Sequence, residues 1–371
     1  MKIIFTGGGT AGHIFPIVAI IREIKRLNPN DFQFYYIGPK DQFAKTILSH
    51  EGVEVKTIIT GKLRRYFSFS NFIDIFIKFP IGILQSFYYV FTLSPDLIFS
   101  KGGYGSLPIV ITGWFFLTPI LLHESDIAPG LANKIASKFS MDIFTAFPIE
   151  KTEYFPAKKM ISVGNPIRKE LLNGSLIEAQ RIFKITGEKP IILILGGSQG
   201  SQRINDKILS IINEFLENFE LIHQTGENNF KEVKSETEAI INENLKPYYH
   251  PVPFLNTEEL SHAYRAAKLV ISRAGAGSIF ELAFLGKASI LIPLKESAQD
   301  HQVKNAYAYA EKGAAIVIEE SNLSSHFLLE TLKNLFKEPK KIRQMEIRAK
   351  EFARPESATL IAEYIISYLF S

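Results

Sequence analysis

The stretch Gly7-Gly8-Gly9-Thr10-Ala11-Gly12-His13 stands between a short β-rich segment at residues 2–6 and an apolar run at residues 14–27. In that run apolar residues recur every three or four positions, which is typical of a helix. Glycines allow a tight turn and a close approach of the backbone to a ligand. Because the first N–H groups of a helix are free, they suit a phosphate. The stretch therefore predicts a strand, an anion-binding loop and a helix.

The same residues match the pattern G-x-G-x-x-G through Gly7, Gly9 and Gly12. In dinucleotide-binding proteins this pattern is accompanied by an acidic residue at the end of the second strand. Here the expected second strand, 33–37, runs into Gly38-Pro39-Lys40, and the next acid is Asp41. The loop therefore indicates a phosphate-like anion without indicating NAD.

The composition limits the classes of protein that fit. A chain of 371 residues, 46% hydrophobic and 22% charged, is long and apolar enough for two packed domains. It has no cysteine, which fits a reducing cytoplasm, and its first residues lack the apolar length of a signal peptide. The net charge of +4 is too small to suggest a nucleic-acid partner, but it allows attraction to an anionic membrane.

Short apolar segments alternate with helical patterns along the whole chain, which is typical of parallel sheets covered on both faces. A second apolar strand and glycine loop, 190–195 and Gly196-Gly197-Ser198-Gln199-Gly200, begin the pattern again and precede an expected helix at 201–216. We therefore expect an α/β protein of two doubly wound, Rossmann-like domains with an interdomain cleft. The expected strands lie at 2–6, 33–37, 53–58, 96–100, 119–123, 142–145, 160–163, 190–195, 220–224, 248–252, 269–272, 289–292 and 315–318.

Residues 102–122 carry no charge and reach the length of a membrane span. Pro108, Pro119 and several glycines interrupt this segment, so we interpret it as a loop, a helix and a strand of a buried core. At the C-terminal end two helices are expected, at 340–352 and 356–369.

Polar residues follow expected strands, where doubly wound sheets bind ligands. His13 opens the first helix, whose dipole favours a neutral ring that can accept a proton. Glu124 and Asp126 follow the strand at 119–123 and would serve either as reactive groups or as caps of the next helix.

The segment 271–281 contains small residues, Arg273 and Glu281 where a strand leads into a helix. Such a helix start suits a diphosphate, and Glu281, one turn inside, suits the diol of a ribose. The amides near Gln302 would hold sugar hydroxyls or simply face solvent at a helix start.

A basic segment precedes a dense aromatic and aliphatic stretch at 72–79. Basic side chains beside apolar ones predict an amphipathic surface for anionic lipid; the alternative is an ordinary core helix with a basic entrance. The residues concerned are Lys62, Arg64, Arg65, Phe67, Phe69 and Phe72. The chain has no Asp-x-Asp pair, no His-x-x-x-His pair and no Gly-x-Ser-x-Gly turn, so we expect no metal and no cofactor.

Taken together, these motifs resemble the MurG family of glycosyltransferases over essentially the whole chain. The residues that carry the resemblance are Gly8 to Pro16, Gly102-Gly103-Tyr104, His123-Glu124, Val163 to Arg168, Gly196 to Gly200, and Arg273 to Glu281. The resemblance implies a GT-B fold, in which residues 1–163 with the helix 353–371 bind acceptor and membrane, and residues 164–352 bind UDP-GlcNAc. The implied reaction is inverting transfer of N-acetylglucosamine to the 4-hydroxyl of lipid I (undecaprenyl-diphospho-MurNAc-pentapeptide), giving lipid II at the cytoplasmic face of the membrane.

The resemblance also assigns residues. His13 and Glu124 match positions that serve the acceptor or catalysis, and Gly102, Gly103 and Tyr104 match a family motif placed on the acceptor side. Arg273 would add charge for the leaving UDP. Donor-binding positions match at Thr10, Ala11, Gly12, Arg168, Ser198, Leu255, Ala276, Gly277, Ser278, Ile279, Phe280, Glu281 and Gln302.

Two residues depart from the family pattern. Ala11 replaces a second loop glycine, and Asp126 stands where the family has asparagine beside the donor sugar. An ionised carboxylate accepts hydrogen bonds but cannot donate one, so one contact with the sugar would differ. The alternatives are another membrane-associated GT-B enzyme that makes glycolipids, or a UDP-sugar-binding protein without catalysis.

Overall fold

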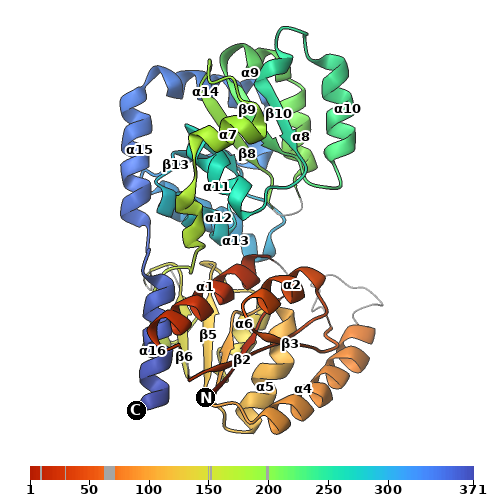
Figure 1. Ribbon diagram of the computed structural model, residues 1–371, viewed down its shortest axis with the longest axis vertical. Coiled ribbons are helices and arrows are strands. Elements are labelled where there is room, and N and C mark those ends of the chain that lie inside the picture. The colour runs from red at the N-terminus through yellow and green to blue at the C-terminus, as the bar shows by residue number, and fades with distance from the viewer. Residues whose placement is uncertain (9–10, 30, 62–71, 149, 151–152, 198–199) are drawn as a thin grey trace. The chain divides into compact units, whose positions relative to one another are not determined.

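The computed structural model describes the chain except residues 9–10, 30, 62–71, 149, 151–152 and 198–199. The chain forms two compact units (Figure 1). Unit 1 comprises Met1–Arg168 and Arg354–Ser371, and unit 2 comprises Lys169–Ala353. The functional division between acceptor and donor domains stays a prediction.

Unit 1 is built on a parallel sheet in the order β3-β2-β1-β4-β5-β6-β7. The order changes direction at β1, because β2 and β3 lie on one side of it and β4 to β7 on the other. Such a switch point is where doubly wound sheets bind ligands. The strands are β1 Lys2–Thr6, β2 Gln33–Gly38, β3 Glu54–Thr57, β4 Leu97–Ser100, β5 Ile120–Glu124, β6 Asp142–Thr145 and β7 Met160–Ser162.

The last helix of the chain, α16 (Ser357–Phe370), belongs to unit 1 and packs against α1 (Ala11–Leu27) (Figure 1). Its buried Ile361 and Ile365 share a core with Ile17 of α1 and Phe144 of β6. The other helical segments among the described residues of this unit are α2 Gln42–His50, η1 Asp74–Lys78, α4 Phe79–Leu93, η2 Tyr104–Ser106, α5 Leu107–Phe115, α6 Leu131–Ala136 and η4 Ala157–Lys159.

Unit 2 repeats the plan with a parallel sheet in the order β10-β9-β8-β11-β12-β13, which changes direction at β8. Its strands are β8 Ile191–Leu195, β9 Glu220–Gln224, β10 Tyr249–Val252, β11 Leu269–Ser272, β12 Ser289–Leu291 and β13 Ala315–Val317. Its helical segments are η5 Lys169–Asn173, α7 Leu176–Phe183, α8 Gln202–Leu209, α9 Ile212–Asn218, α10 Phe230–Ile240, η6 Lys246–Tyr248, α11 Thr257–Ala266, α12 Ala276–Leu285, η7 Ala298–Asp300, α13 His301–Ala310, η8 Glu320–Asn322, α14 Ser325–Lys337 and α15 Pro339–Phe352.

Every expected strand is found within a few residues of its predicted position, and the expectation of two Rossmann-like sheets is confirmed. The single helix expected at 201–216 is wrong, because α8 ends at Leu209 and α9 begins at Ile212. Ser210 is the C-cap of α8, and the backbone of Ile211 is not helical, with φ of −128° and ψ of 19°.

Residues 102–122 form η2, α5 and β5, as interpreted from their prolines, and much of α5 is buried. A different segment, Asp74–Leu93, is long and apolar enough to cross a membrane by length and composition. Only 17% of its most apolar window is buried, so this segment exposes an unusual amount of apolar surface.

Candidate active site

In unit 1 the ends of β1 and β4 lie side by side at the switch point. Thr6 pairs with Ser100 in the sheet, and the backbone N–H of Lys101 donates to the carbonyl of Thr6 at 2.8 Å. A Cβ built on Gly7 would lie 3.5 Å from the Cβ of Lys101. The first glycine loop and the segment after β4 therefore share one site.

The ring of His13, on the first turn of α1, folds back over this loop. A Cβ built on Gly8 would lie 3.1 Å from Cε1 of His13, and one on Gly103 would lie 3.1 Å from the backbone N of Gly8. Burial lowers the pKa of His13 to about 4, helped by the nearby Lys101 and opposed by Asp126. The imidazole is therefore neutral at pH 7, as the sequence predicts, with burial as the main cause.

Glu124 is the last residue of β5 and is almost fully buried. Its Oε1 accepts the backbone N–H of Asp126 at 2.9 Å, and its Oε2 accepts the amide of Asn133 at 2.7 Å. The amide oxygen of Asn133 in turn accepts the N–H of Gly103 at 3.1 Å. Burial, with the charge of Asp126, raises the pKa of Glu124 to about 7, although Lys101 and these hydrogen bonds lower it.

The surroundings of Glu124 and Asp126 bear on the two interpretations of these carboxylates. Gly130 is the N-cap of the next helix, α6, and glycine has no side chain that could cap it. Glu124 and Asp126 belong to a polar cluster with His13 and Lys101 at the carboxyl edge of the sheet. Their role as reactive groups stays a prediction.

Gly102 and Gly103 have structural reasons to be glycine. Their φ angles are +87° and +86°, which side chains rarely tolerate. A Cβ on Gly102 would also lie 2.1 Å from the amide oxygen of Asn133. Because the fold alone explains both glycines, the only support for placing them on the acceptor side is that they lie next to the loop that carries His13.

In unit 2 the start of α12 is open. Gly275 is the N-cap and has no side chain that could cap the first N–H groups of the helix. A Cβ built on Gly275 or Gly277 would meet no atom of the described residues within 4 Å, and neither residue has a positive φ. Because the fold itself does not require glycine at these two positions, the open space fits a ligand that approaches the backbone closely.

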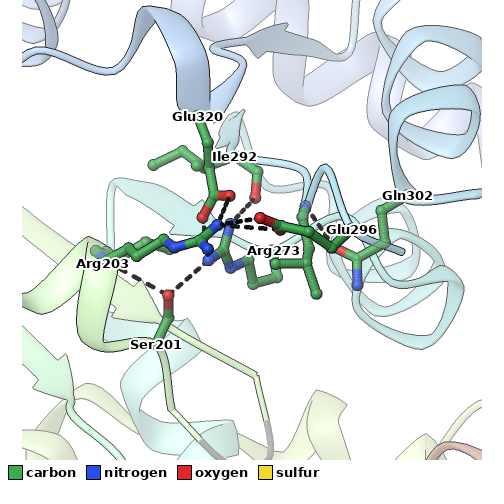
Figure 2. A network of polar contacts seen from close by, with 9 residues as sticks. Ser201, Arg203, Arg273, Ile292, Glu296, Gln302 and Glu320 are labelled. Carbon is green, nitrogen blue, oxygen red and sulfur yellow. Dashed lines mark hydrogen bonds and ion pairs between the residues drawn. The ribbon is translucent and has the colours of Figure 1, made fainter. Parts of the chain in front are cut away.

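Arg273, directly after β11, is held inside a network of polar contacts (Figure 2). Its guanidinium donates to Glu320 at 2.5 Å, to the hydroxyl of Ser201 at 2.7 Å and to the carbonyl of Ile292 at 3.1 Å. The second carboxylate oxygen of Glu320 binds Arg203 at 2.8 Å. The charge of Arg273 is thus compensated within the protein, and the side chain joins β11 to the start of α8 and to η8.

The loop before α13 also has features that fit a ligand-binding site. The amide oxygen of Gln302 accepts the N–H of Leu294 at 3.0 Å, which holds the loop against α13 (Figure 2). Gln299 and Asp300 have φ angles of +57° and +54°. Positive φ in such residues costs free energy and is concentrated at functional sites.

One residue that the sequence did not single out joins two expected donor-binding segments. Gln224, the last residue of β9, donates to the carbonyl of Gly197 in the second glycine loop at 3.0 Å. Its amide oxygen accepts the N–H of Leu255 at 3.2 Å. The position of Gln224 at the end of a strand, beside β8, was the feature of the sequence from which it could have been predicted.

Other expected site residues lie as follows. Ile279 and Phe280 are buried in the unit 2 core, so their side chains are not available to a ligand and only their backbone groups could contact one. Arg168 stacks its guanidinium on the ring of Phe15 at 4.1 Å, and Glu281 and Ser278 are partly buried on α12. Thr10, Ser198, Lys62, Arg64, Arg65, Phe67 and Phe69, and the side chain of Ala11, lie outside the described residues.

Comparisons with known proteins agree with this architecture. Residues 3–145 match the glycosyltransferase family 28 N-terminal domain, and residues 191–361 match the glycosyltransferase family 28 C-terminal domain. Among solved structures, MurG of Acinetobacter baumannii has a TM-score of 0.74 at 22% identity and covers 99% of both chains. UDP-GlcNAc 2-epimerase of Neisseria meningitidis, bound to UDP-GlcNAc, has a TM-score of 0.68 at 14% identity, covering 99% of this chain and 100% of that chain. Both likenesses show the fold, which is GT-B.

Curated relatives are more similar in sequence. Proteins of Clostridium tetani and Clostridium kluyveri are 38% and 36% identical to this chain. The first match covers 92% of this chain and 91% of the relative, and the second covers 98% and 99%. Both relatives are UDP-N-acetylglucosamine--N-acetylmuramyl-(pentapeptide) pyrophosphoryl-undecaprenol N-acetylglucosamine transferases. The chain therefore belongs to the family of these transferases, the MurG family, within glycosyltransferase family 28.

Proposed function

We propose that the protein transfers N-acetylglucosamine from UDP-GlcNAc to the 4-hydroxyl of lipid I, with inversion at the sugar carbon, to give lipid II for peptidoglycan synthesis. The names of the curated relatives support both substrates. The observation that carries the proposal is the open start of α12, where the Cβ positions of Gly275 and Gly277 meet no described atom within 4 Å. A nucleoside diphosphate is a ligand that uses such a helix start.

The groups proposed for the diphosphate and the ribose of the donor come from unit 2. The diphosphate would accept N–H groups at Ala276 to Ser278, and Glu281 would bind the ribose diol. As the bond between the sugar carbon and UDP breaks, negative charge develops on the diphosphate, and the helix N-terminus stabilises it. Arg273 contributes by positioning β11, since Glu320 already neutralises it.

The acceptor groups come from unit 1. The 4-hydroxyl attacks the sugar carbon on the face opposite to UDP and passes its proton to a base. We nominate His13 first, because its ring is neutral and the residue as a whole is partly exposed. Glu124 is second: its raised pKa suits a base at neutral pH, but both of its oxygens already hold protein N–H groups.

We further propose that unit 1 rests on the anionic cytoplasmic membrane surface. Gly82, Ser86 and Val90 bury one face of α4, and the backbone N–H of Ile59 donates to Gln85 at 2.7 Å. The opposite face exposes Leu84 by 70% and Phe91 by 69%. Because one face of α4 is packed on the unit, a helix that lies in the interface fits better than one that spans the bilayer.

The end of α5 extends this apolar surface. Phe115 and Trp114 are exposed, and Phe87 of α4 contacts the ring of Phe115 at a centroid distance of 4.8 Å. We define the membrane surface as Leu84, Tyr88, Phe91, Trp114 and Phe115. The basic residues expected beside it lie outside the described residues, and they would add attraction to anionic lipid.

Replacing Leu84 and Phe91 together by serine is expected to weaken binding to vesicles that contain anionic lipid by about tenfold or more, because each exposed apolar side chain contributes free energy on burial. Flotation with lipid vesicles measures the bound fraction. Ile177 of unit 2, 75% exposed on α7, is the matched control, and Ile177→Ser should bind as the original protein does. Equal binding by all three proteins would contradict the assigned surface.

The rival enzymes differ in the acceptor. A glycolipid-forming GT-B transferase would use diacylglycerol, whereas the proposed function requires a muramoyl lipid. Incubation with labelled UDP-GlcNAc and either lipid should label only lipid I. Labelling of diacylglycerol alone would contradict the proposed acceptor and leave the transferase assignment intact.

A further inference from the structure

A buried lysine lies at the centre of the unit 1 cluster. Lys101 is 2% exposed, and its ammonium donates to the hydroxyl of Ser125. The hydroxyl of Ser125 donates onward to the amide oxygen of Asn165 at 2.9 Å. A buried ammonium costs free energy unless opposite charges and hydrogen bonds compensate it. We therefore expect compensating groups around Lys101.

Charged and titratable groups surround Lys101 from each neighbouring element. Glu124 of β5 and Asp126 in the following loop act on it with opposite charge. His13 of α1 and His123 of β5 carry rings whose pKa values it lowers. Two carboxylates near one cation form a compensated group, whereas the same carboxylates without the cation would repel each other.

We propose that Lys101 is a positioning residue: its buried ammonium is the counter-charge of the Glu124–Asp126 pair, and through Ser125 it fixes the loop that carries Asp126. The residue does not touch substrate, because it is buried beneath the loop. Its role is to keep Glu124 ionised and the ring of His13 neutral, whichever of them accepts the proton. The inference depends on the proposed function only for the test that measures transferase activity.

The pKa values give the sign of the expected effect. Lys101 lowers the pKa of His13, which lies at about 4, and that of Glu124, which lies at about 7. Its own pKa is lowered to about 8, chiefly by burial, so it is charged at neutral pH. Removing the charge should raise both other pKa values and move the acidic limb of kcat/KM to higher pH.

The test compares Lys101→Met, Lys101→Gln and Lys101→Arg between about pH 4 and pH 9, a range that covers the pKa values of both His13 and Glu124 and their expected upward shifts. Met and Gln should move the acidic limb upward by roughly one to two pH units, as expected for a charge lost at short range, and Arg should leave it near its original position. A purely structural role would instead lower activity equally at every pH. The side chain of Gln can still donate a hydrogen bond to Ser125, so the Lys101→Gln variant provides the test if Lys101→Met does not fold.

A second readout needs no activity. NMR titration of the His13 ring, assigned by its loss in His13→Ala, should show a higher pKa in Lys101→Gln than in the original protein. Lys287 of unit 2 is the matched control, since it is partly buried and its pKa is also lowered to about 8; Lys287→Met should shift neither readout. If the His13 titration and the acidic limb of kcat/KM both stay unchanged, the inference is overturned. If the original protein has no activity, only the proposed function fails, and the NMR titration still tests the inference.

Discussion

Replacing His13 by alanine is expected to lower kcat by about 10²- to 10⁴-fold, the usual contribution of a positioned base. The neutral ring lies on the first glycine loop and beside Gly103, and no backbone group can take over proton transfer from the hydroxyl. Donor binding should remain within a few fold, since the proposed contacts with the diphosphate and the ribose belong to unit 2. Single-turnover kinetics with lipid I, together with UDP affinity by calorimetry, separates the two effects.

The control for this variant is His50→Ala, because His50 is exposed at the end of α2 and far from the cluster in sequence. It should retain the original kcat. A His13→Ala protein that keeps nearly the original kcat removes His13 from the role of base. Glu124→Gln would then be expected to show the large loss instead.

Replacing Gly277 by alanine is expected to separate stability from donor binding. The residue lies in the first turn of α12 with open space around its Cβ position, so alanine fits and should stabilise the helix by about 0.5–1 kcal/mol. With UDP-GlcNAc the same methyl would displace the diphosphate from an N–H group, at a cost of about 1–3 kcal/mol. The donor KM should therefore rise by roughly 5- to 100-fold.

Gly286→Ala is the matched control at the other end of α12. Gly286 has a φ of +65°, and its Cβ would lie 2.6 Å from Cε of Lys350. This variant should lower the melting temperature and leave the donor KM unchanged, which is the reverse pattern. A Gly277→Ala protein with the original donor KM would contradict the placement of the diphosphate at α12.

Much of the fold could be predicted because buried parallel strands are short, continuous apolar runs with glycine-containing turns after them. The strand at Ile191–Leu195 and the loop after it are an example. The break between α8 and α9 could not be predicted, since the helical pattern continues through Ser210 and Ile211. The break lies in the backbone of Ile211, whose φ of −128° and ψ of 19° are not helical, and the apolar pattern carries no signal of this.

The polar site was predictable in part. Residues after strands, such as Glu124 and Arg273, were found because the ends of parallel strands gather at one edge of the sheet. The partner of Arg273 was not found, because Glu320 lies 47 residues further along the chain. Lys101 was overlooked for a similar reason: a lysine after a strand is usually solvated, and only the packed structure shows that it is buried.

The most direct test of the central claim is the release of UDP from UDP-GlcNAc with and without lipid I. The proposed function predicts rapid UDP release only when lipid I is present, with one N-acetylglucosamine incorporated into the lipid for each UDP released. Binding of UDP-GlcNAc without UDP release in the presence of lipid I would show a sugar-nucleotide-binding protein without transferase activity, and would contradict the account.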